Sequence, residues 1–102
     1  MNQHGFIINP RVDTPTAAVD ALRGIPVAIL GDSVGRLSGS FGLRPMHDGT
    51  PMAGIAFTVK TRPGDNLMIH KALQLARPGD ILVVDGSGAL EHALIGELMT
   101  LT

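Results

Sequence analysis

The 102-residue chain contains no cysteine, tryptophan or tyrosine, and only three phenylalanines. The absence of cysteine excludes disulfide bonds, thiolate metal sites and cysteine nucleophiles, and it is compatible with a reducing compartment. With so few aromatic rings, a stacking platform for bases or sugars is not expected. Eight basic and nine acidic residues give a formal net charge of -1 and form no basic stripe, so neither nucleic acid nor an anionic membrane is expected as a partner.

Long apolar runs are also absent, since the longest cover only residues 27–30 and 81–84, far too short to span a bilayer. Residues 1–10 lack the basic start and apolar core of a signal peptide, so we expect a cytoplasmic location. Hydrophobic residues make up 44% and charged residues 17%, which favours a globular chain over a disordered one. The length allows one domain at most, with a small core.

The most regular pattern runs from residue 54 to residue 85. Residues 54–60 are apolar and β-branched, which predicts a strand, and apolar side chains at helical spacing follow over residues 66–76. Residues 81–85 predict a second strand, and its continuously apolar start suits a strand covered on both faces of a parallel sheet. Together these segments predict a βαβ unit with neighbouring parallel strands and a right-handed crossover.

The tetrapeptide Arg-Pro-Gly-Asp occurs twice, at residues 62–65 and 77–80, on either side of the predicted helix. In the first copy, proline and glycine suit the central positions of a tight turn, and Asp65 or Asn66 can cap the helix that follows. In the second copy, the same Pro-Gly pair ends that helix.

The first half of the chain is less regular. Residues 15–22 suit a short helix with Thr14 as a possible cap, whereas residues 25–30 are compatible with a strand or with the start of a helix. Glycines at positions 35, 39 and 42 predict a loop, and so does the stretch over residues 45–51, which a proline bounds at each end.

Residues 31–35 read Gly-Asp-Ser-Val-Gly and match the G-x-S-x-G pattern in which Ser33 would be a nucleophile. The preceding residues also resemble the first block of the GDSL-type esterases. That chemistry requires a histidine base held by an acidic residue, and no Asp-x-x-His follows. A helix end punctuated by glycines is therefore the favoured interpretation of this segment.

Histidines are the residues most often found at metal sites, and the chain has four of them: His4, His47, His70 and His92. No two of them lie four residues apart, as a helical metal site would require, and H-E-x-x-H is absent. Surface or packing roles are favoured for all four.

Two glycine-containing segments could approach an anion. Residues 85–90 follow the second predicted strand at its carboxyl end, where ligands bind in open α/β sheets, although the pattern is neither a P-loop nor a dinucleotide fingerprint. A plain strand-to-helix loop is favoured there. Residues 96–99 read Gly-Glu-Leu-Met, and a helix beginning near Gly96 would offer main-chain N–H groups to a carboxylate such as that of pyruvate.

Four segments together resemble the RraA-like family, which includes the 4-hydroxy-4-methyl-2-oxoglutarate aldolases. They are residues 54–67, 68–73, 76–86 and 93–98, and they match without gaps. Residues 32–36 also resemble the family's Asp-x-x-Gly-Arg segment, which is helical. The resemblance implies an α/β fold of the swivelling β/β/α type. On this basis residues 1–102 form a single, partial RraA-like domain, truncated, with the βαβ unit at residues 54–85.

The resemblance also implies an activity. Aldolases of this family cleave 4-hydroxy-4-methyl-2-oxoglutarate to two pyruvates and often decarboxylate oxaloacetate, and Mg²⁺ or Mn²⁺ acts as a Lewis acid on the 2-keto acid. The family's main-chain carboxylate site maps onto Gly96, Glu97, Leu98 and Met99. Glu97 also occupies the acidic position that orders the water molecules of the metal, which implies a catalytic role. The family assembles as trimers or hexamers, so a homo-oligomer is expected.

The family's substrate-binding arginine and metal-binding aspartate come later than Thr102, so no metal ligand is expected within this chain. The apolar residues 94–102 are followed by no helix stop signal, which also suggests an interrupted chain. Alone, the chain is expected to be inactive, as the N-terminal part of a metal-dependent aldolase. The alternative is an RraA-type regulator that binds an RNA-processing endonuclease without catalysis, and the presence of Glu97 favours the aldolase.

Overall fold

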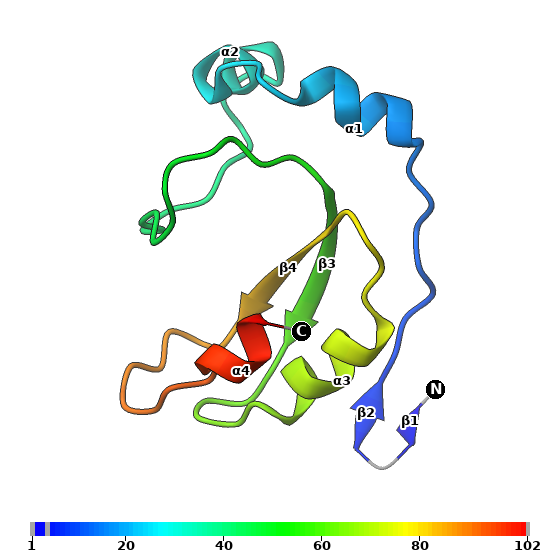
Figure 1. The fold of residues 1–102 in the computed structure, drawn as a ribbon, viewed down its shortest axis with the longest axis vertical. Coiled ribbons are helices and arrows are strands. Elements are labelled where there is room, and N and C mark those ends of the chain that lie inside the picture. Colours follow the sequence, from blue (N-terminus) through cyan, green and yellow to red (C-terminus); the bar gives the residue numbers. More distant parts are fainter. Residues whose placement is uncertain (1, 4, 102) are drawn as a thin grey trace. The chain divides into compact units, whose positions relative to one another are not determined.

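The computed structural model describes residues 2–3 and 5–101 (Figure 1). The chain divides into two compact units, one formed by residues 1–13 and 54–102 and the other by residues 14–53. In chain order the elements are β1 (Asn2–Gln3), β2 (Phe6–Ile7), α1 (Thr16–Leu22), α2 (Val27–Ser33), β3 (Ile55–Lys60), α3 (Leu67–Leu75), β4 (Asp80–Asp85) and α4 (Glu97–Thr100). No helix within the described ranges is long and apolar enough to cross a membrane.

Strands β3 and β4 are neighbours and run parallel, with α3 between them in the sequence (Figure 1). Their register begins with Ile55 opposite Asp80 and ends with Lys60 opposite Asp85. The predicted βαβ unit is therefore confirmed, with both strands and the helix within one residue of the expected boundaries. The chain as described is a small α/β protein.

The core of this unit lies between α3 and one face of the two strands. Val59, Ile69 and Ala72 are buried, and six half-buried apolar side chains pack against them: Phe57, Met68, Leu82, Val84, Leu94 and Met99. The opposite face is open in the described part of the chain, where Val83 is 48% exposed. The expectation that this strand is covered on both faces is wrong here, because α3 supplies only one layer.

Both Arg-Pro-Gly-Asp sequences fold into the same turn. In each copy the aspartate N–H donates a hydrogen bond to the arginine carbonyl, over 3.1 Å in residues 62–65 and 3.0 Å in residues 77–80. Gly64 and Gly79, the third residues, have φ angles of 75° and 89°. A proline followed by a glycine with positive φ is typical of a type II turn, so the local sequence determines both corners of the βαβ unit.

Both residues that the sequence offers as caps, Asp65 and Asn66, lie at the start of α3. Asn66 occupies the N-cap position, but its side chain makes no capping hydrogen bond within the described residues. The carboxylate of Asp65 instead accepts a hydrogen bond from the N–H of Leu67 at 2.9 Å. At the other end the helix stops at Leu75, before Pro78, as the sequence predicts.

The unit of residues 14–53 contains α1 and α2 followed by loop. Pro15, in an extended conformation, is the N-cap residue of α1, so the expectation that Thr14 caps this helix is wrong by one position. Residues 25–30, which the sequence left open between strand and helix, lead into α2 after Pro26. Proline is common just before or at the first helical turn, because the N–H that it lacks has no partner there.

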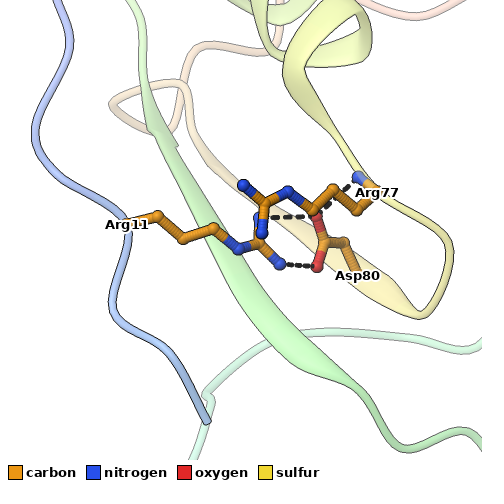
Figure 2. Close-up of polar contacts among 3 residues, drawn as sticks. All are labelled: Arg11, Arg77 and Asp80. Carbon is orange, nitrogen blue, oxygen red and sulfur yellow. Dashed lines mark hydrogen bonds and ion pairs between the residues drawn. The ribbon is translucent and has the colours of Figure 1, made fainter.

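An ion pair attaches the N-terminal segment to the βαβ unit (Figure 2). Both terminal nitrogens of Arg11 donate to the carboxylate of Asp80, with Nη1 2.9 Å from Oδ2, and the main-chain N–H of Arg77 donates to the same carboxylate at 2.8 Å. The Asp80 side chain is only 3% exposed. The hydrogen bonds from Arg11, and then that from Arg77, lower the pKa of Asp80 to about 2.

Candidate functional site

The polar groups of the βαβ unit gather where its parallel strands end. Lys60 closes β3 and Asp85 closes β4, and their side chains form an exposed ion pair with Nζ 2.8 Å from Oδ2. The hydrogen bond from Lys60 lowers the pKa of Asp85. The turn at residues 62–65, the loop after β4 and α4 all follow this end of the sheet (Figure 1). The carboxyl ends of parallel strands are the usual ligand-binding edge of an α/β sheet.

The loop after β4 is a closed turn. The carboxylate of Asp85 accepts a hydrogen bond from the N–H of Ser87 at 2.9 Å, and the N–H of Ala89 donates to the carbonyl of Gly86 at 3.3 Å. Ser87 and Gly88 both have positive φ angles, which is typical of a type I′ turn. The Ser87 N–H therefore already has an acidic partner, and the plain connecting role that the sequence favoured stays a prediction.

The segment before α4 runs closely against the βαβ unit. The side-chain Nδ2 of Asn66 donates a hydrogen bond to the carbonyl of Leu94 over 3.2 Å. A Cβ atom on Gly64 would lie 2.6 Å from Cδ2 of His92, and one on Gly86 would lie 3.1 Å from Cδ1 of Leu94. Two glycines thus leave room for this segment, whose path brings residues 96–99 to the carboxyl edge of the sheet.

Helix α4 carries the residues to which the resemblance assigns a carboxylate site. Gly96 is the N-cap, Glu97 lies in the first turn, and the N–H of Thr100 donates to the carbonyl of Gly96 at 3.4 Å. Gly96, Glu97 and Leu98 are exposed, whereas Met99 packs against the core. The structure therefore brings all four residues into one turn that is anchored on one side and open on the other.

The backbone conformation of Gly96 does not require glycine. Its φ of -115° and ψ of 174° are extended values that any residue adopts. A Cβ atom placed there would meet nothing within 4 Å in the described part of the chain, its two chain neighbours aside. Glycine is a favoured N-cap residue, and its missing Cβ would also permit a ligand to approach the main chain closely.

The acidic and histidine side chains do not form a complete metal site. Within residues 2–3 and 5–101, no three His, Cys, Asp or Glu side chains lie close enough to hold a metal ion together. Glu97 offers one exposed carboxylate beside the main chain of α4. Such a group suits a Mg²⁺ or Mn²⁺ ion that keeps several waters, but it does not make a site by itself.

The Ser33 nucleophile is not supported by the structure. Ser33 is the last residue of α2, and its hydroxyl donates to the carbonyl of Ile29 at 3.0 Å. A nucleophile elbow requires a strand before the serine, but residues 27–32 are helical. The alternative interpretation, a helix end punctuated by glycines, is confirmed, and Arg36 pairs with Asp32 across it at 2.7 Å.

The described histidines lie on different elements. Nε2 of His47 lies 3.2 Å from the carbonyl of Thr50, in the loop before β3. His70 is exposed on α3, and His92 lies against Gly64. His4 is outside the described residues. The surface and packing roles expected from the sequence agree with these positions.

Three polar contacts of the βαβ unit and its flanking segments were not predicted from the sequence. Neither the Asn66–Leu94 hydrogen bond nor the Arg11–Asp80 ion pair has a local signature, because the partners are 28 and 69 residues apart. The Lys60–Asp85 pair did have a signal. Once the strands are aligned as a parallel pair that ends at these two residues, opposite charges face each other across the sheet.

Comparison with known proteins identifies the family. A family profile described as "RraA-like: Aldolase/RraA" matches residues 16–102. The chain is 30% identical, over 82 residues, to a Halalkalibacterium halodurans protein that carries the provisional name 4-hydroxy-4-methyl-2-oxoglutarate aldolase. The match covers 79% of this chain but only 39% of that relative's length. No solved structure gives a significant match. The chain therefore belongs to the RraA-like family.

Proposed function

We propose that the protein is a metal-dependent 2-oxo acid lyase that cleaves 4-hydroxy-4-methyl-2-oxoglutarate to two pyruvates and also decarboxylates oxaloacetate. Family membership and the name of the Halalkalibacterium halodurans relative support this reaction class. The proposal includes the swivelling β/β/α fold and homotrimeric or hexameric assembly in the cytoplasm. It also places the substrate carboxylate on the main chain of residues 96–99.

The observation that carries the proposal is the exposed main chain at the start of α4. Gly96 lies at the carboxyl edge of the parallel strands, and its main chain is not covered by a side chain of its own. Its extended backbone conformation does not require glycine. A carboxylate can accept hydrogen bonds from main-chain N–H groups at such a position, and the absent Cβ permits its close approach. Met99, packed on the core, keeps this turn in a fixed place.

Glu97 is the residue to which we assign the metal-related role. Its exposed carboxylate lies next to the proposed carboxylate site and can hold water molecules of a Mg²⁺ or Mn²⁺ ion. When bound, such an ion would stabilise the negative charge that develops on the 2-oxo oxygen. Further ligands would have to come from outside the described residues or from the substrate, and Glu97 would orient the metal's waters without replacing those ligands.

The test is pyruvate release from 4-hydroxy-4-methyl-2-oxoglutarate and from oxaloacetate, by protein expressed from its own reading frame, with Mn²⁺ or Mg²⁺ and with excess EDTA. We expect release that requires the metal, exceeds the rate of the metal alone and is inhibited by oxalate. The lyase proposal would be refuted if the protein releases no pyruvate from either compound. If the same protein inhibits an RNA-processing endonuclease without a metal, the alternative function as a regulator would be supported.

A further inference from the structure

Asn66 links two segments that are far apart in the sequence. It stands half-buried at the start of α3, and its side-chain Nδ2 lies 3.2 Å from the carbonyl oxygen of Leu94, 28 residues later. Leu94 precedes Gly96 by two residues, so this hydrogen bond acts on the main chain just before the proposed carboxylate site. The start of α3 and the entry to α4 are therefore joined by one side-chain amide.

Asn66 is not occupied with the task that asparagine usually performs at the start of a helix. An N-cap asparagine normally accepts a hydrogen bond from the helix through its side-chain oxygen. Here the Asn66 side chain makes no such bond within the described residues, and Asp65 accepts the hydrogen bond from the N–H of Leu67 instead. The Asn66 amide donates a hydrogen bond to the carbonyl of Leu94.

Side-chain packing also holds this segment. The side chains of Leu94 and Met99 pack on the core, and the ring of His92 lies against Gly64. These contacts fix side chains, whereas the bond from Asn66 fixes a peptide carbonyl. The orientation of that peptide determines how the chain enters Gly96.

We propose that Asn66 is a positioning residue, which acts through the carbonyl of Leu94 to hold the main chain of residues 96–99 in place for the substrate carboxylate. This inference rests on the proposed function of that turn. Asn66 does not touch the substrate in this account. Its loss should therefore weaken substrate binding more than it slows the reaction of bound substrate.

The decisive variant is Asn66→Asp. Aspartate has nearly the same size and is as good an N-cap residue as asparagine, so α3 should form as before. An ionised carboxylate cannot donate a hydrogen bond, and it would face the Leu94 carbonyl with a like partial charge. Asn9→Asp makes the same chemical change at an exposed position and serves as the matched control.

Amide hydrogen exchange in the whole protein measures the tether directly. In Asn66→Asp we expect residues 95–99 to exchange about threefold to tenfold faster, as for the loss of one hydrogen bond, with the amides of residues 71–75 unchanged. Asn9→Asp should exchange like the wild-type protein. Unchanged exchange at residues 95–99 in Asn66→Asp would overturn the proposal.

Kinetics with oxaloacetate and Mn²⁺ distinguish positioning from general damage. We expect the KM of oxaloacetate and the inhibition constant of oxalate to rise together by about threefold to tenfold, with kcat changed less than twofold. A fall in kcat with an unchanged KM would indicate loss of folded protein and contradict the proposal. If the wild-type protein binds no oxalate, the proposed function fails, and the exchange data alone decide whether Asn66 holds this turn.

Discussion

Replacing Gly96 by alanine should separate the stability of the protein from its ligand binding. The extended backbone at Gly96 accepts any residue, and a Cβ atom there meets nothing within 4 Å among the described residues beyond its chain neighbours. The loss of chain entropy in the unfolded state favours alanine by about 0.4–1 kcal/mol. Glycine is the better N-cap residue by a similar amount, about 1 kcal/mol. The free energy of unfolding should therefore change by less than about 1 kcal/mol.

Ligand binding should respond in a different way. A methyl group between the main chain and a bound carboxylate is an overpacked contact, which costs about 1–3 kcal/mol. The inhibition constant of oxalate should therefore rise by about fivefold to about 150-fold in Gly96→Ala. Gly96→Ser should bind oxalate as weakly, although serine caps the helix at least as well as glycine.

Urea unfolding and oxalate inhibition of pyruvate release, measured on the same preparations, provide the assay. Gly31→Ala is the matched control, because Gly31 lies in α2 and a Cβ there also has open space among the described residues. That control should be more stable by about 1 kcal/mol, as for glycine to alanine within a helix, and should keep wild-type oxalate inhibition. Oxalate inhibition that is unchanged in Gly96→Ala would refute the reasoning about the exposed main chain.

Three further outcomes are expected. Gly54→Ala should lower the free energy of unfolding by about 1–3 kcal/mol in urea, because its Cβ would lie 2.3 Å from the carbonyl oxygen of Gly79; wild-type stability would contradict that close approach. The pKa of Asp80 is lowered to about 2, so the stability that its bond to Arg11 provides is complete above pH 3.8 and is lost as the pH falls toward 2. Asp80→Asn should therefore have a lower melting temperature at pH 7, and its melting temperature should decline less between pH 3.8 and pH 2. A pH profile of the melting temperature that matches the wild-type profile would disprove this. Glu97→Gln should raise the Mn²⁺ concentration needed for half-maximal pyruvate release by about 10- to 100-fold, and an unaltered metal requirement would exclude the role assigned to Glu97.

The βαβ unit was predictable because its signals are local. Two Pro-Gly pairs mark the corners, and the hydrophobic period changes between them from that of a strand to that of a helix. The cap position was predictable to within one residue, since both Asp65 and Asn66 are suitable. By contrast, residues 25–30 are too short to show a period, and only the structure shows that residues 27–30 belong to a helix.

The residues of the proposed site come from the resemblance, whereas the contacts that support it had no local signal. The resemblance identified residues 96–99, and the structure places them in one exposed turn. The bond from Asn66 to Leu94 and the pair of Arg11 with Asp80 depend on how distant segments pack, which no local pattern encodes. The exposure of Val83 also depends on whether a second layer covers the sheet, and an apolar run alone does not determine it.

The most direct test of the central claim is to follow the main-chain amides of ¹⁵N-labelled protein while oxalate is added in the presence of Mg²⁺. We expect the amide signals of Glu97 and Met99 to move downfield, as N–H groups do when they donate to a carboxylate, and to saturate at the oxalate concentration that inhibits pyruvate release. Amides of α1 should remain in place. Saturating oxalate that inhibits the reaction but leaves the signals of residues 96–99 unmoved would contradict the account.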